Sequence, residues 1–197
     1  MPSNYLCNHL KVMKKKGIAL DFGCGKLRYS EQLVEKFDSV TFLDSRKQIE
    51  RNQMIRGIKT SVINYVSSHY KKASVVPFEE VQSIDNKYDF VLCSNVLSAI
   101  PCRMTIDKVL SSIKSLLKHD GEALIVNQYK SSYFKRYESG IKHLYGYIYR
   151  NSSSSSYYGL LDESSVRSIC QDNGLSIVKS WSREGSSYVI VRVEDNN

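Results

Sequence analysis

The sequence lacks the cysteine and histidine spacings that disulfide frameworks and metal sites require. Its five cysteines are far apart and include no C-x-x-C pair; they are Cys7, Cys24, Cys93, Cys102 and Cys170. The four histidines are equally scattered. Disulfide-rich domains and zinc sites need paired or closely spaced ligands. We therefore expect reduced thiols and no bound metal.

Long apolar runs are also missing. The uncharged apolar stretches have the length of strands, and no leader pattern opens the chain. A membrane-crossing helix needs about 20 consecutive apolar residues, and a secretory leader has a basic segment followed by an apolar one. We therefore expect a protein that does not enter the membrane and that works in the cytoplasm.

The size and charge of the chain leave several functions open. Its 197 residues, 42% of them hydrophobic, are enough for a single domain spanning residues 1–197. The net charge of +8 suits an acidic small molecule, a nucleic acid or an anionic surface equally well. Charge alone does not choose among these partners.

The most informative segment is a glycine turn after an apolar run. The run at residues 17–20 leads into Asp21-Phe22-Gly23-Cys24-Gly25, and a second run at residues 40–43 ends in Asp44. Two parallel strands joined by a helix would bring both strand ends to one edge of a sheet. Glycines let the backbone approach a ligand there, and a carboxylate suits ribose hydroxyls. The pattern predicts a nucleoside-binding α/β domain.

The detail of the turn argues against a dinucleotide. A G-x-G-x-x-G turn rests a pyrophosphate on helix amides, whereas Lys26, Leu27 and Arg28 follow Gly25 here. The segment resembles motif I of the class I S-adenosylmethionine-dependent methyltransferases, which often reads acid-x-G-x-G-x-G. Leu27 stands at the place of the last glycine.

Two downstream segments resemble the same family. Residues 88–97 look like its fourth strand and the loop after it, and residues 121–126 look like its fifth strand. The resemblance implies a doubly wound, mostly parallel seven-stranded sheet that ends in an antiparallel hairpin. In addition, apolar spacing predicts a helix that begins after Asp44 and continues to about Gly57.

The resemblance implies S-adenosylmethionine as the cofactor. Gly23 and Gly25 would let its methionine portion approach the backbone, and Asp21 would orient its ammonium group. Asp44 would accept hydrogen bonds from both ribose hydroxyls. The complete set of cofactor-binding candidates is Asp21, Gly23, Cys24, Gly25, Arg28, Asp44, Ser45, Phe78, Ser94 and Asn95. Arg28 could instead cover a helix surface, and Phe78 could be a core aromatic rather than a wall against the adenine.

Residues 129–160 have an unusual composition, in which tyrosines alternate with lysines and arginines. We expect this segment to be a lid over the methyl acceptor, because tyrosine offers stacking faces and hydroxyls while the basic residues suit anionic groups. No motif fixes a catalytic residue. The candidates are Asn95, Tyr129, Tyr133 and His143, the last as a general base.

The sequence supports three functions. The first is methyl transfer to an oxygen or nitrogen of a small molecule, which could be anionic. The second is methylation of RNA or another nucleic acid, since interleaved aromatic and basic residues also bind single strands. The third is a non-catalytic, methyltransferase-like partner subunit. Methyl transfer needs alignment rather than a covalent triad, so the lack of a Ser-His-Asp pattern does not exclude an enzyme.

Overall fold

The structure is a computed structural model that describes residues 2–14 and 16–193. The chain divides into two compact units, Met1–Leu92 with Leu116–Gly121 and Cys93–Ser115 with Glu122–Asn197. Residue 1 and residues 194–197, the ends of the predicted single domain, lie outside the described residues. That the chain acts as one domain stays a prediction.

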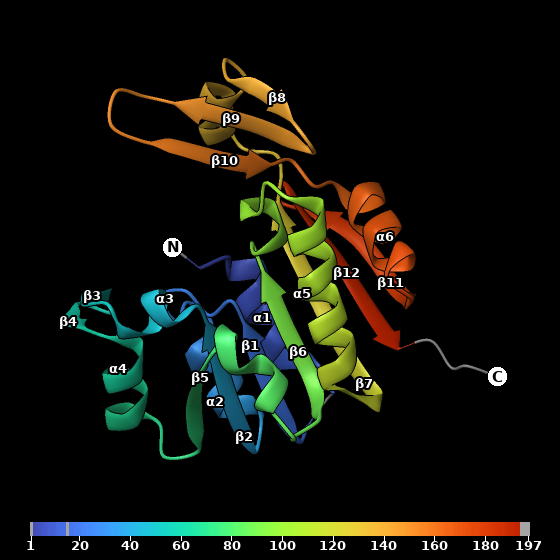
Figure 1. Cartoon of the computed structure of the whole chain (residues 1–197). Helices are drawn as coiled ribbons and strands as arrows, with labels where there is room; N and C mark the ends of the chain where they lie inside the picture. Colours follow the sequence, from blue (N-terminus) through green and yellow to red (C-terminus); the bar gives the residue numbers. More distant parts are fainter. Residues whose placement is uncertain (1, 15, 194–197) are drawn as a thin grey trace. The chain divides into compact units, whose positions relative to one another are not determined.

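Seven strands form one sheet in the order β11-β12-β7-β6-β1-β2-β5 (Figure 1). β1, β2 and β5 pair in parallel, whereas β12 pairs antiparallel with both β7 and β11. The fold class expected from the sequence is therefore confirmed, including the C-terminal hairpin. The strands of this sheet are β1 (Ile18–Phe22), β2 (Ser39–Asp44), β5 (Ala73–Pro77), β6 (Tyr88–Ser94), β7 (Leu117–Gln128), β11 (Leu175–Arg183) and β12 (Ser186–Val193).

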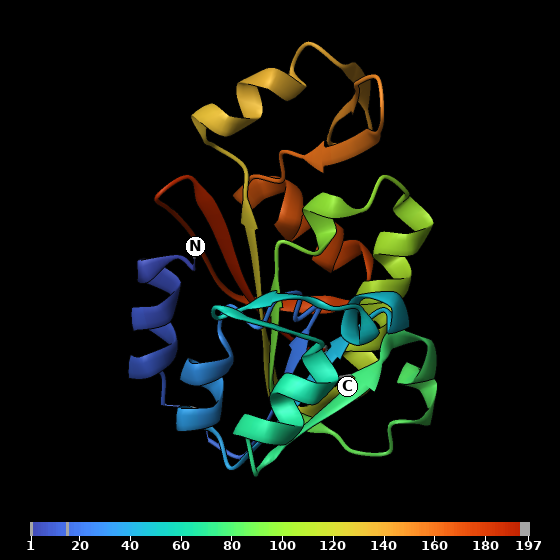
Figure 2. The ribbon, with the colours of Figure 1, turned by 90° about the vertical axis from the view of Figure 1, so that its left-hand side faces the viewer.

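The first unit is built around the parallel strands β1, β2 and β5. Four of the five residues of β1 are buried, which is typical of a parallel strand covered on both faces. Two of its helices, α1 and α2, lie side by side along these strands (Figure 2). The helices of this unit are α1 (Asn4–Val12), α2 (Ser30–Lys36), α3 (Arg46–Glu50), α4 (Val62–His69) and the 3-10 helix η1 (Phe78–Ser83).

The helix expected to continue to Gly57 is much shorter in the structure. α3 ends at Glu50, and β3 (Gln53–Ile55) and β4 (Ile58–Thr60) then form an antiparallel hairpin. Its two turn residues, Arg56 and Gly57, have φ angles of 47° and 84°. Two consecutive positive φ angles match the twist of a two-residue hairpin and cannot be part of an α-helix. The prediction was wrong because Arg56 gives no sequence sign of this conformation.

The second unit contains the C-terminal hairpin and a separate three-stranded antiparallel sheet in the order β10-β9-β8 (Figure 1). No described helix combines the length and the apolar composition that a membrane crossing requires. The other elements begun in this unit are η2 (Leu97–Ala99), α5 (Arg103–Leu116), η3 (Ser132–Tyr137), β8 (Ile141–His143), β9 (Gly146–Arg150), β10 (Ser155–Gly159) and α6 (Glu163–Asp172).

The tyrosine-rich segment, residues 129–160, has its own aromatic packing. The ring of Phe134 on η3 stacks on Tyr158 of β10, with centroids 4.1 Å apart, and Tyr137 packs against both. Phe134 and Tyr137 are buried. Part of its aromatic content therefore serves as a small core that holds η3 on the three-stranded sheet. Its role as a lid stays a prediction.

Candidate functional site

The glycine turn joins β1 to α2 and is fixed to the neighbouring strand. The amide groups of Gly23 and Cys24 both donate to the carbonyl oxygen of Leu43 on β2, at 2.7 and 3.0 Å. Gly23 and Gly25 have φ angles of 78° and 56°. Glycine adopts this region without the steric cost that a side chain would add. The two glycines thus let the chain fold back at the carboxyl end of β1.

Leu27, at the place of the motif's last glycine, has a left-handed backbone conformation. Its φ angle is 58°, its side chain is fully buried, and its amide donates to the carbonyl oxygen of Cys24 at 2.9 Å. A left-handed conformation costs a residue with a side chain about 1–2 kcal/mol. Burial of the leucine side chain offsets this strain.

Asp44, at the carboxyl end of β2, contacts the glycine turn directly. Its Oδ2 accepts a hydrogen bond from the Gly25 amide at 2.9 Å, and its Oδ1 accepts one from the Ser45 amide at 2.8 Å. A carboxylate can accept about four hydrogen bonds, so it retains lone pairs for a ligand. A side-chain carbon added at Gly25 would meet no atom closer than the Gly23 carbonyl oxygen at 4.0 Å. Open space therefore lies over the turn.

Gln48 is a site residue that the sequence did not reveal. Its Nε2 donates to the Gly25 carbonyl oxygen at 2.7 Å and to Oε1 of Gln53 at 3.2 Å. Both polar groups of Gly25 are therefore held, the amide by Asp44 at the end of β2 and the carbonyl by Gln48 on α3. A single glutamine within a short helix belongs to no motif, so nothing in the sequence distinguished it from a surface residue.

Asp21 is buried beside Asp44. Its side chain is 3% exposed, and burial together with the charge of Asp44 raises its pKa from 3.8 to about 7. Removal from water disfavours a carboxylate, and a second carboxylate nearby disfavours it further. Strongly raised pKa values of this kind are common where a ligand supplies the missing charge. The two predicted carboxylates thus share one edge of the first unit.

Cys24 lies within the same group. It is buried, and burial followed by the charges of Asp21 and Asp44 raises the pKa of its thiol well above 9.0. The nucleophilic form of cysteine is the thiolate. Cys24 is therefore a neutral thiol that fills the space between two glycines.

The remaining candidates of the first unit lie around this turn with differing exposure. Ser45 begins α3, where its Oγ accepts a hydrogen bond from the Gln48 amide at 3.3 Å. Phe78, just after β5, packs edge-on against Phe22 with ring centroids 5.7 Å apart. It is half-buried, so it contributes to the core and keeps part of its ring accessible. Arg28 is exposed.

In the second unit, Ser94 is the last residue of β6 and Asn95 follows it. Asn95 has a φ angle of 58°, and its Oδ1 accepts a hydrogen bond from the Gln128 amide at 2.8 Å. Its side chain thereby extends the pairing of β6 with β7 beyond the last strand residue. The Oγ of Ser94 is buried and has no hydrogen-bond partner within residues 2–14 and 16–193. Such a group is costly unless a ligand or water satisfies it.

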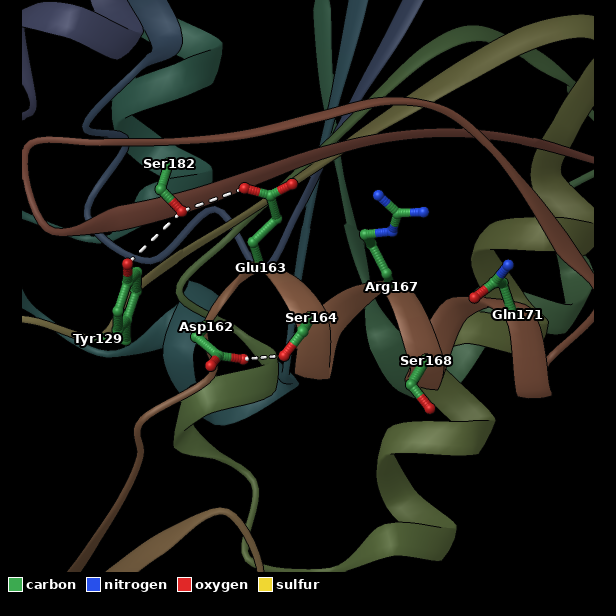
Figure 3. Close-up of a pocket in the computed structure, with 8 residues that line it drawn as sticks. All are labelled: Tyr129, Asp162, Glu163, Ser164, Arg167, Ser168, Gln171 and Ser182. Atoms are coloured by element: carbon green, nitrogen blue, oxygen red, sulfur yellow. Dashed lines mark hydrogen bonds between the residues drawn. The ribbon is translucent and has the colours of Figure 1, made fainter.

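The three other catalytic candidates of the second unit lie in different surroundings. The hydroxyl of Tyr129 lies 3.5 Å from the Ser182 Oγ, at the edge of a pocket of about 490 Å³ (Figure 3). Tyr133 is 54% exposed, and the Arg136 guanidinium lies 3.9 Å from its ring centroid. His143 Nε2 lies 2.7 Å from the Pro101 carbonyl oxygen. Because a carbonyl only accepts, this nitrogen carries the proton, and only Nδ1 could act as a base.

Comparisons with known proteins identify the family of the chain and structures with a similar fold. A family model described as a methyltransferase domain matches residues 6–180. The uncharacterized protein YmfD of Escherichia coli (strain K12) is 66% identical over 97% of this chain and 86% of its own length. A structure of the DhpI–SAH complex has a TM-score of 0.69 at 13% identity, covering 96% of this chain and 82% of that one. An S-adenosylmethionine-dependent methyltransferase from Clostridium acetobutylicum has a TM-score of 0.64 at 14% identity, covering 96% and 88%.

Proposed function

Since the chain belongs to the methyltransferase domain family, we propose that it is an S-adenosylmethionine-dependent methyltransferase. We further propose that it transfers the methyl group to an oxygen or nitrogen atom of a small molecule in the cytoplasm. The single observation that carries the proposal is the pair of carboxylates, Asp21 and Asp44, at one glycine turn with open space above Gly25.

The residues of the turn fit the cofactor. Gly23 and Gly25 would give its methionine portion access to the backbone. The ammonium group of the cofactor would compensate the buried carboxylate of Asp21, which is costly to ionise alone. Asp44 would accept hydrogen bonds from the ribose hydroxyls with the lone pairs that the Gly25 and Ser45 amides leave open.

Methyl transfer requires no covalent intermediate with the protein. S-adenosylmethionine, when bound, supplies a methyl group activated by a sulfonium. The chain's own residues would hold the two reactants in line, exclude water and, for a protonated acceptor, remove a proton. Asn95, Tyr129, Tyr133 and Nδ1 of His143 remain our candidates for contacts to the acceptor.

For the acceptor we propose a small molecule that binds under residues 129–160. The exposed ring of Tyr133 beside the Arg136 guanidinium offers a stacking surface and a positive charge together. An acceptor with a flat or anionic part would suit this pair, and the net charge of +8 favours an anion generally.

The same pair supports RNA or another nucleic acid as an alternative acceptor, because single strands bind to aromatic faces flanked by cations. This version predicts salt-sensitive binding of a single-stranded oligoribonucleotide that weakens when Lys135 and Arg136 are both changed to alanine. A variant with Lys71 and Lys72 changed to alanine, exposed residues of the first unit, keeps the net charge comparable. Equal binding by both double variants, or none at low salt, would exclude the alternative.

The cofactor assignment is tested by isothermal titration with S-adenosylmethionine. We expect Asp44→Ala to weaken binding about tenfold or more, because it removes charge-assisted hydrogen bonds. Asp38→Ala is the matched control, since Asp38 is an exposed carboxylate just before the other end of β2. No binding by the unchanged protein would exclude the enzyme and favour a non-catalytic partner subunit.

A further inference from the structure

A pocket of the second unit lies beside α6 and β11, and its role is unassigned (Figure 3). Its volume of about 490 Å³ is within the range of small-molecule sites. Solvent reaches it, because several lining residues on α6 are exposed. The pocket is lined by Tyr129, Asp162, Glu163, Ser164, Arg167, Ser168, Gln171 and Ser182.

Two oppositely charged side chains of this pocket stand next to each other without pairing. Glu163 and Arg167 are four residues apart on α6, the spacing and order at which such residues usually form an ion pair. They form no direct ion pair in the described part of the chain, and Figure 3 shows the two side chains unconnected. Instead, Ser180 lies between them: its Oγ donates to Glu163 Oε1 at 2.6 Å and accepts from Arg167 Nη1 at 3.2 Å.

Both charged groups keep unused hydrogen-bonding capacity. A guanidinium has five N–H donors, and the bond to Ser180 uses one of those of Arg167. The second carboxylate oxygen of Glu163 accepts from Ser182 at 3.3 Å, which leaves further lone pairs on the group. The hydroxyl of Tyr129 approaches Ser182 in turn. Ser180 therefore bridges two opposite charges at the wall of the pocket, and these charges do not pair with each other directly.

We propose that this pocket binds a small zwitterion of the α-amino acid type. The ligand's ammonium group would meet Glu163, and its carboxylate would form a forked pair with Arg167. Side chains four residues apart on a helix have Cβ atoms about 5–6 Å apart, which suits two opposite charges separated by one carbon atom. A ligand with one sign of charge would satisfy only one of the two groups. A neutral polyol would leave the charge of both without a partner.

The test is titration calorimetry of the full chain, without S-adenosylmethionine, against each of the standard free α-amino acids. Acetate, methylamine and sorbitol are the comparison probes, because each carries only part of the proposed chemistry. We expect at least one amino acid to bind and the three comparison probes to bind about tenfold or more weakly. The methionine portion of S-adenosylmethionine is itself an α-amino acid, so a free amino acid can also bind at the glycine turn. Binding that is lost in the Glu163 and Arg167 variants and kept in Asp44→Ala belongs to this pocket, and that result does not depend on the transferase proposal.

Three variants locate the binding. Glu163→Gln and Arg167→Gln each remove one charge, and both are expected to weaken amino-acid binding about tenfold or more. Ser180→Ala keeps both charges but lets them pair directly, and we expect a similar loss. Glu184→Gln, at the exposed turn of the C-terminal hairpin, is the control and should bind as the unchanged protein does. Circular dichroism establishes that each variant is folded.

Three results would overturn the proposal. The first is that no amino acid binds to the unchanged protein. The second is that sorbitol or acetate binds as tightly as the best amino acid. The third is that Ser180→Ala binds that amino acid as well as the unchanged protein does, since Ser180 would then not be what keeps the pair open.

Discussion

Replacing Asp21 with asparagine should make the cofactor-free protein more stable and weaken its binding of S-adenosylmethionine. The carboxyl group is 3% exposed, and its pKa is raised from 3.8 to about 7 by burial and by the charge of Asp44. Asparagine has nearly the same shape but no charge to bury. A residue that costs stability in this way is expected where a ligand later compensates it.

The magnitude follows from the two pKa values. One pH unit of pKa difference corresponds to about 1.4 kcal/mol, so ionising Asp21 costs the native state roughly 4 kcal/mol above pH 7. Between pH 3.8 and about 7 the folded protein binds more protons at this group than the unfolded chain does. The free energy of unfolding is therefore highest at low pH, where Asp21 is protonated in both states, and falls by roughly 4 kcal/mol as the pH rises from 3.8 to about 7. A buried amide without good partners costs about 1–3 kcal/mol, so the net gain from asparagine should be about 1–3 kcal/mol at pH 8.

Urea unfolding followed by circular dichroism at pH 5 and pH 8 measures this difference. At pH 5 only about 1.6 kcal/mol of this stability has been lost, and the cost of burying the amide offsets it, so asparagine should bring no net gain. At pH 8 it should raise the free energy of unfolding. If asparagine lowers stability equally at both pH values, the carboxylate is not strained by its surroundings and our account of the site is wrong.

Variants at two further positions, Leu27 and Gln48, test the turn itself. Leu27→Gly and Leu27→Ala should both destabilise the protein by about 2–5 kcal/mol through lost packing. The glycine variant should be at least as stable as the alanine variant, because only glycine relieves the strain of the positive φ angle. Thermal unfolding checks this order, and an alanine variant more stable by about 1 kcal/mol or more would contradict it. Gln48→Leu should weaken S-adenosylmethionine binding about 2- to 10-fold by releasing the Gly25 carbonyl, while Lys47→Ala, on the same helix and exposed, should not. Calorimetry that finds the two variants equal would exclude this role for Gln48.

The strands that could be predicted are those in which an apolar run or a family motif marks the sequence. β1 and β2 were found from two such runs, each leading to an acid, whereas β6, β7 and the C-terminal hairpin followed from the family resemblance. The hairpin of β3 and β4 was missed because its turn depends on a positive φ angle at Arg56, a residue type with no preference for it. The small sheet within residues 129–160 was missed because its strands are only three to five residues long and the segment was interpreted from its composition alone.

The residues of the candidate site also fall into those that a motif predicted and those that depend on tertiary contacts. The family resemblance located Asp21, the glycines and Asp44, because a motif ties each to a backbone feature. Gln48 could not be located, since its role depends on a contact with a carbonyl oxygen 23 residues earlier in the chain. The open ion pair of Glu163 and Arg167 depends likewise on Ser180, whose position between them follows from how β11 packs on α6.

A crystal structure of the protein with S-adenosylhomocysteine would test the central claim most directly. We predict that both ribose hydroxyls donate to the Asp44 carboxylate, and that the amino group lies within reach of Asp21, directly or through one water. A ligand bound elsewhere, or bound at the turn with its ribose away from Asp44, would contradict the account.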